Sequence, residues 1–196
     1  MSPPFPPAIL LSVMVVGEAL LMRSRLSGDA SRQADRGSLR LLFVVMAVSV
    51  GLAWWAARVF PRARAETLFG LGATAMTGLY GAGLILFVAG LALRWYAVMY
   101  LGRLFTYDVA IAADHRVIDS GPYRLVRHPA YTGSLLSFVG LGVYGGNVLS
   151  LAVMVVPIAL AFLRRIAVEE AALTSALGSG YADYAARTRR LVPFVY

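Results

Sequence analysis

The 196-residue sequence contains no cysteine, no lysine and only two histidines, His115 and His128. The absence of cysteine excludes disulfides, thiolate nucleophiles and metal sites with sulfur ligands. Two histidines do not make a multi-histidine metal site, so we expect no metal cofactor. Chemistry is left to arginines, carboxylates, tyrosines and the two imidazoles.

Charge is scarce as well. Charged residues make up 14% of the chain and hydrophobic residues 59%, with a mean hydropathy of +0.71. A soluble domain of this length carries about 25% charged residues. We therefore expect a single domain whose surface mostly faces lipid.

All 18 basic residues are arginines, and they contribute to a formal net charge of +8. In a nucleic-acid-binding protein they would gather on one face of a polar domain. Here they lie between apolar runs, which is typical of the charged flanks of membrane helices. We therefore expect the lipid bilayer as a partner, and no nucleic acid.

Five apolar runs predict membrane-spanning helices, the last two by extension into their flanking sequence. No positive residue precedes the first run, so we expect a spanning helix there and not a signal peptide. The sequence thus predicts an all-α integral membrane protein with about five transmembrane helices. The runs are residues 7–22, 41–60, 67–93, 130–144 and 149–163.

Prolines and glycines divide these runs. Pro61 ends the second run, and Gly145, Gly146 and Asn147 predict a tight turn that joins the last two as a helical hairpin. Small residues in the third run, Gly83 among them, allow close helix packing in lipid.

The arginines predict the orientation. Five lie between the first and second runs, five between the third and fourth (counting Arg94 in that loop) and five in the C-terminal tail. Three belong to the loop between the second and third runs if Arg58, near the end of the second run, is counted with Arg62 and Arg64, and none lies in the hairpin turn. The positive-inside rule then places the N-terminus outside and the loop 94–129 and the tail together in the cytoplasm.

Glu18 lies inside the first run. An acidic side chain in the membrane is costly and marks a functional site by default. Its closeness to the arginine-rich end of the run favours an interfacial glutamate that reaches the aqueous boundary.

Two polar stretches flank the hairpin. Pro129 suits the first turn of the fourth helix, so Arg127 and His128 stand at a helix N-terminus whose free N–H groups favour an anionic ligand group. On the fifth helix Arg165 and Glu169 are four residues apart and face the same side. Each pattern alone is typical of a membrane flank or a solvated ion pair. At matching ends of one hairpin they predict one cytoplasmic polar pocket.

Three motifs then carry a resemblance. They are GPYRLVRHPAYTG (121–133), RRIAVEEAAL (164–173) and LGSGYADYAARTRRLVPF (177–194). Together they resemble the isoprenylcysteine carboxyl methyltransferase family, which belongs to a wider group of membrane methyltransferases that includes phospholipid N-methyltransferases. The resemblance covers about residues 101–194 and divides the single domain into an N-terminal three-helix part, 1–93, and a methyltransferase-like catalytic region, 94–196.

The resemblance implies S-adenosyl-L-methionine as the methyl donor. It also implies catalytic roles for three residues: Arg165 facing an acceptor carboxylate, Glu169 holding the amino group of the cofactor, and Arg127 supporting the cluster. The cofactor-binding residues that it implies are His115, Arg116, Val117, Ile118, Tyr123, His128, Pro129, Ala130, Tyr131 and Glu169.

The implied acceptor is lipophilic or prenylated and carries a carboxylate. An arginine that orients this carboxylate is sufficient, and no strong general base is needed. One departure concerns the acceptor: Ile166, Ala167 and Val168 precede Glu169, where the eukaryotic pattern has a longer acidic run. The cofactor is therefore better supported than a prenylated protein as substrate, and a small lipid acid is an equal alternative.

Other functions remain open from the sequence. A phospholipid or amine N-methyltransferase would have to deprotonate its acceptor and would gain nothing from Arg165. A sterol-reductase-like enzyme would bind a nicotinamide cofactor at a related C-terminal architecture. A non-catalytic transporter subunit should carry polar residues at mid-bilayer depth in several helices, and only Glu18 and Asn147 come near.

Overall fold

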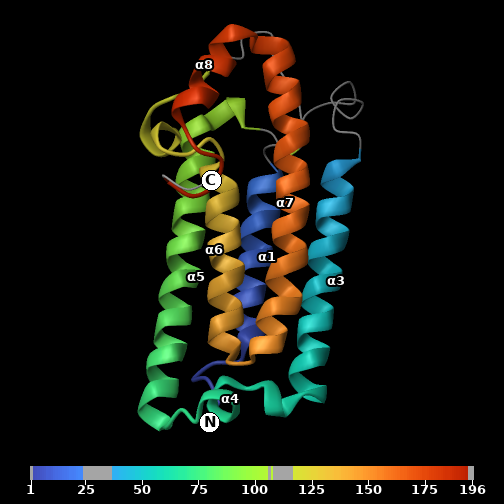
Figure 1. Ribbon diagram of the computed structural model, residues 1–196, viewed down its shortest axis with the longest axis vertical. Helices are drawn as coiled ribbons and strands as arrows, with labels where there is room; N and C mark the ends of the chain where they lie inside the picture. Colours follow the sequence, from blue (N-terminus) through green and yellow to red (C-terminus); the bar gives the residue numbers. More distant parts are fainter. Residues whose placement is uncertain (1, 24–36, 106, 108–116, 194–196) are drawn as a thin grey trace.

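The computed structural model describes residues 2–23, 37–105, 107 and 117–193. Five long helices run side by side, with the N-terminus at the end that carries α4 and the C-terminus at the end that carries α8 (Figure 1). Short 3₁₀ turns η2 (Pro61–Ala63), η3 (Gly102–Leu104) and η4 (Gly121–Arg124) lie between helices. The helices are α1 (Pro7–Arg23), α3 (Ser38–Val59), α4 (Ala65–Phe69), α5 (Ala73–Leu101), α6 (Pro129–Gly145), α7 (Val148–Leu177) and α8 (Ser179–Arg187).

The chain is mostly helical and suited to the membrane. No strand occurs among the residues described, apart from two isolated bridges. Three helices, α3, α5 and α7, are long and apolar enough to cross a bilayer. Large apolar side chains such as Ile85, Val88 and Leu160 point outward from the bundle, as in helices whose solvent is lipid. The prediction of an all-α integral membrane protein is confirmed at this level.

The predicted hairpin turn is confirmed. α6 ends at Gly145, and Gly146 takes a left-handed conformation with φ 67° that suits glycine at a helix C-terminus. Asn147 then caps α7, because its side-chain oxygen accepts a hydrogen bond of 2.9 Å from the backbone N–H of Ser150. At the other predicted break, α3 ends at Val59, two residues before Pro61.

The prediction of one helix over 67–93 is wrong at both ends. Gly70 has φ 64° and ends the short helix α4, and α5 begins only at Ala73. α5 then continues to Leu101, so Arg94 lies buried inside a helix and not in a loop. Its charge is tolerated there because Glu18 from α1 pairs with it.

α5 and α6 approach to backbone contact. A Cβ atom on Gly83 would lie 2.4 Å from the Tyr144 nitrogen, and one on Gly140 would lie 2.3 Å from the Phe87 nitrogen. One on Gly133 would lie 2.5 Å from the nitrogen of Arg94. The predicted close packing is confirmed at Gly83, and it fixes the height of Arg94 beside the first turn of α6.

α7 continues well beyond the predicted run 149–163 and reaches Leu177. It therefore presents Arg165 and Glu169 from one continuous helix, whose end extends beyond the start of α6 (Figure 1). After α8 the chain returns to the loop before α6, where Val126 and Arg189 form a parallel bridge. This return brings the tail against the RHP motif.

Candidate active site

Glu170 on α7 is the centre of one polar cluster. Its Oε1 accepts a hydrogen bond from Arg127 Nε at 2.8 Å and lies 3.3 Å from His128 Nε2. Its Oε2 accepts from Arg190 Nε at 3.0 Å. The Glu170 side chain is only 13% exposed, so one carboxylate ties α7 to the RHP loop and to the tail.

Arg127 is fully engaged within this cluster. Its Nη1 donates to the carbonyl oxygens of Ala185, at 2.9 Å, and Thr188, at 2.6 Å, besides the bond from Nε to Glu170. The backbone N–H groups of Arg127 and His128 donate to tail carbonyls at 2.7 Å and 3.1 Å. The returning tail therefore engages the N–H groups of these two residues, and the predicted anion-binding role of the first-turn N–H groups of α6 stays a prediction.

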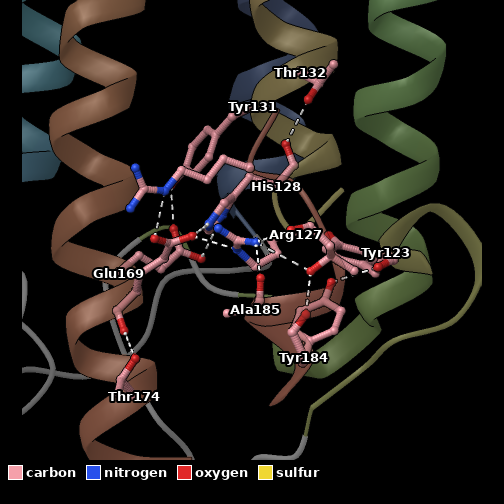
Figure 2. Close-up of polar contacts among 12 residues, drawn as sticks. Tyr123, Arg127, His128, Tyr131, Thr132, Glu169, Thr174, Tyr184 and Ala185 are labelled. Atoms are coloured by element: carbon pink, nitrogen blue, oxygen red, sulfur yellow. Dashed lines mark hydrogen bonds and ion pairs between the residues drawn. The ribbon is translucent and has the colours of Figure 1, made fainter. Parts of the chain in front are cut away.

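Glu169 lies in a different environment from its neighbour. The Tyr131 hydroxyl donates to its Oε2 at 2.9 Å, and His128 Nδ1 lies 3.9 Å from its Oε1. The Glu169 side chain is 31% exposed, and Figure 2 shows Tyr131 and His128 reaching it from α6 and the residue before α6. This carboxylate therefore keeps access for a ligand.

Arg165 is buried, at 2% exposure. Its Nη1 donates to the Ser38 hydroxyl at 2.5 Å, a second nitrogen donates to the Tyr107 carbonyl, and Nε lies 3.4 Å from the Tyr131 hydroxyl. The alternative of a solvated ion pair with Glu169 is wrong, since Arg165 is inside the bundle. The Tyr131 hydroxyl instead bridges Arg165 and Glu169.

Tyr131 also borders a cavity between α1, α3, α5, α6 and α7. Its ring packs 5.2 Å from that of Phe162 and 5.7 Å from that of His128, centroid to centroid. The cavity is mainly apolar and runs toward the middle of the bundle. Its lining residues are Met14, Glu18, Leu39, Leu42, Phe43, Met46, Leu91, Arg94, Phe105, Tyr107, Tyr131, Ser134, Ser137 and Phe162.

Glu18 reaches this cavity as half of a buried ion pair. Arg94 donates to both of its carboxylate oxygens, through Nε to Oε1 and through Nη2 to Oε2 at 2.6 Å. The Tyr107 hydroxyl donates to Glu18 Oε2 at 2.8 Å, and Arg94 Nη1 reaches the Ala130 carbonyl at 3.3 Å. The expectation of an interfacial glutamate is therefore wrong, because an arginine from α5 meets it within the bundle.

The remaining predicted cofactor residues lie in different surroundings. Pro129 and Ala130 are buried in the first turn of α6. The hydroxyl of Tyr123 donates to the Ala97 carbonyl at 3.3 Å. Ile118 packs against the hydrophobic cluster that contains Tyr123 and Ala97. Val117 is half-buried. His115 and Arg116 lie outside the described residues.

Sequence reasoning did not assign two further residues, Glu170 and Tyr181. The second glutamate of the EE pair gave a signal, but sequence alone does not say which of two adjacent carboxylates takes the arginines. Tyr181 is 4% exposed and its hydroxyl has no hydrogen-bond partner among the residues described. Burial, followed by the charges of Glu170 and Glu169, raises the pKa of this phenol, which stays protonated and able to donate.

Comparison with known proteins agrees with the motifs. The sequence model of the isoprenylcysteine carboxyl methyltransferase (ICMT) family matches residues 83–175. A probable protein-S-isoprenylcysteine O-methyltransferase of Oryza sativa subsp. indica is 36% identical over 115 residues, which cover 58% of this chain and 60% of the relative. Protein-S-isoprenylcysteine O-methyltransferase B of Arabidopsis thaliana is 36% identical over 115 residues, 58% of each chain. The alignments thus span less than two thirds of these plant relatives.

The fold also has a solved counterpart. The structure of the eukaryotic intramembrane Ras methyltransferase ICMT superposes with a TM-score of 0.66 and 24% sequence identity, covering 98% of this chain and 69% of that one. This likeness shows a shared fold. The resemblance predicted from the C-terminal motifs is confirmed, because the sequence model of the isoprenylcysteine carboxyl methyltransferase family matches residues 83–175 of this chain.

Proposed function

We propose that the protein transfers a methyl group from S-adenosyl-L-methionine to the carboxylate of a lipid-like or isoprenylated, prenylcysteine-type acceptor in the membrane. The observation that carries this proposal is the position of Tyr131. Its hydroxyl contacts both Glu169, which is accessible, and the buried Arg165, while its ring borders the apolar cavity. One side chain thus joins a polar site to an apolar cavity.

The residues present fit the proposed cofactor. A cofactor of this kind carries an ammonium group, for which the exposed carboxylate of Glu169 is a suitable acceptor. The buried Tyr181 hydroxyl, without a partner in the described part of the chain, is a donor awaiting an acceptor. Tyr123, His128 and the buried first turn of α6 would complete the walls. When bound, S-adenosyl-L-methionine supplies a methyl group activated by a sulfonium.

The cavity fits the proposed acceptor. Its walls from α3 and α7 present Leu42, Phe43 and Phe162, which suit an isoprenoid or acyl chain. The carboxylate end would lie toward Tyr131 and Arg165. Because Ser38 and the Tyr107 carbonyl hold the guanidinium, Arg165 can orient a carboxylate with little loss of side-chain entropy.

The chemistry asks little of the protein beyond position. A carboxylate with a pKa near 4 is already ionised at neutral pH, so no side chain has to remove a proton. An acceptor oxygen forms its bond to the methyl carbon while the bond from that carbon to sulfur breaks. Holding the two partners in line and away from water contributes effective concentrations far above those in solution.

We propose five membrane crossings with the site on the cytoplasmic side and the N-terminus outside. α1 and α6 have 17 residues each, which rise about 26 Å against a hydrocarbon core of about 30 Å, so their flanks complete the crossing. The proposal treats the two parts, 1–93 and 94–196, as one domain, and the hydrogen bond from Arg165 in the second part to Ser38 in the first supports it.

Binding and turnover measured on the same preparation test the function. Detergent-purified protein should bind S-adenosylhomocysteine in calorimetry and ignore NADPH, which distinguishes a methyltransferase from a reductase. Methyl transfer from labelled S-adenosyl-L-methionine should appear on a farnesylated thioacid and not on an ethanolamine phospholipid. Transfer to the ethanolamine lipid alone would indicate an amine methyltransferase instead. Binding of neither cofactor would contradict an enzymatic function of either kind.

A further inference from the structure

A second cavity is lined by residues of the hairpin turn and by Arg64, the residue before α4. These segments lie at the end of the bundle opposite α8 (Figure 1). Residues of α1, α3, α6 and α7 line it. None of its lining residues also lines the cavity beside Tyr131. Its lining residues are Pro3, Pro7, Ala8, Leu11, Val50, Ala53, Trp54, Ala57, Arg58, Arg64, Leu141, Gly142, Gly145, Asn147, Ser150 and Met154.

The polar groups in its wall already have partners. The Asn147 side-chain nitrogen donates to the Phe60 carbonyl at 3.0 Å, and the Ser150 hydroxyl donates to the Ala53 carbonyl at 2.9 Å. The remaining wall is aliphatic or aromatic apart from two arginines. A ligand inside this cavity therefore does not have to make hydrogen bonds with the wall, and a hydrocarbon chain meets that condition.

The two arginines give the cavity a positive border. The guanidinium carbon of Arg58 lies 4.5 Å from the centre of the Trp54 ring. Arg64 Nη2 donates to the Tyr80 hydroxyl at 3.2 Å, and its Nε lies 4.0 Å from Glu66. None of the lining residues is acidic, so two cations border an apolar chamber with one carboxylate close to one of them.

The aromatic residues at this level match a bilayer boundary. Trp54, Trp55 and Phe60 are all exposed near the end of α3, and exposed tryptophans gather at the headgroup level of membranes. Arg58 and Arg64 are thus at the level expected for lipid phosphates.

We propose that this cavity binds an anionic glycerophospholipid, with one acyl chain in the chamber and the phosphate against Arg58 and Arg64. The lipid is recognised by a cation pair joined to a hydrocarbon-lined space, a combination that a neutral headgroup does not complement. The site is separate from the proposed methyltransferase centre and stands or falls independently of it.

Native mass spectrometry of the full chain in detergent tests the proposal. Phosphatidylglycerol and phosphatidylcholine with identical acyl chains are titrated into the wild type and three variants. Loss of one charged contact weakens binding about tenfold, so Arg58→Gln should weaken phosphatidylglycerol binding by that factor. It should weaken phosphatidylcholine binding much less, because the choline ammonium offsets the attraction of that lipid's phosphate to the arginine. Arg62→Gln is the matched control, because Arg62 is exposed in η2, four residues after Arg58, and does not line the cavity.

A third variant separates the chamber from the charges. Ala57→Trp fills the cavity from an exposed helix position that lines it, and should abolish high-affinity binding of phosphatidylglycerol. Binding that is the same in Arg58→Gln, Ala57→Trp and wild type overturns the proposal. Equal affinity for both lipids in the wild type, lost only in Ala57→Trp, also overturns it, since the site is then a chain pocket without headgroup recognition.

Discussion

Glu169 and Glu170 are neighbours in sequence and on α7, yet they lie in opposite situations. Glu170 is surrounded by Arg127, His128 and Arg190 and is nearly buried. Glu169 has the Tyr131 hydroxyl as its near partner and remains accessible. The hydrogen-bond acceptor positions of Glu170 are occupied by side chains of the protein, whereas Glu169 can still accept hydrogen bonds from a ligand. The comparison separates a residue that assembles the site from one that is free to serve it.

The strongest test of that distinction is Glu170→Gln. Removing one partner from a buried, hydrogen-bonded charge cluster typically costs about 3 kcal/mol or more, and here it leaves Arg127 without its carboxylate. We expect a clear fall in the unfolding temperature in detergent without any ligand. Arg187→Gln is the control, because its ion pair with Asp119 is 63% and 50% exposed and contributes little. Equal stability of both variants would make Glu170 no more than a surface charge.

Arg165 provides the next largest effect, on turnover. Arg165→Lys retains the charge but loses the planar fork, so methyl transfer should fall at least about a hundredfold, or about 2.7 kcal/mol in the barrier. Affinity for S-adenosylhomocysteine should stay within a few-fold of wild type, since the Tyr131 hydroxyl lies between Arg165 and Glu169. Normal turnover in the lysine variant would contradict a directional role for the guanidinium.

Glu169→Gln should act on cofactor binding. Loss of a charge-assisted hydrogen bond costs about 1.5–3 kcal/mol, which corresponds to roughly ten- to a hundredfold in affinity for S-adenosylhomocysteine. The unfolding temperature without ligand should change much less than in Glu170→Gln. A variant that loses stability but keeps affinity would reverse the roles of the two glutamates.

The smallest expected effect belongs to Tyr181→Phe. The hydroxyl has no partner in the described part of the chain, so its removal should not destabilise the ligand-free protein and can raise its stability slightly. With S-adenosylhomocysteine the variant should bind about threefold to tenfold more weakly, the worth of one neutral hydrogen bond. Unchanged affinity in calorimetry would show that the ligand does not reach this hydroxyl.

The sequence was informative where the signal is local. The turn at 145–147, the break before Pro61 and the hairpin that joins the two polar stretches follow from residues adjacent in the chain. The burial of Arg94 could not be predicted this way. Whether an arginine at the end of an apolar run leaves the helix depends on a partner 76 positions away, Glu18, and on how closely α5 meets α6.

The same limit explains the miss at Glu170. Successive residues on a helix point about 100° apart, so an EE pair always offers one carboxylate to each of two directions. Which direction meets Arg127 and which meets Tyr131 is decided by the position of α8 and the returning tail. No spacing within 164–173 contains that information.

The pairing of the tail with the RHP loop has a consequence for biogenesis. Arg127 and His128 donate their backbone N–H groups to Arg189 and Arg190, and Thr132 donates its hydroxyl to the Leu191 carbonyl at 2.7 Å. Residues 189–191 follow all the described helices in the chain, so they are synthesised after them. The loop before α6 therefore lacks these partners until residues 189–191 have been made, and the site cannot assemble earlier.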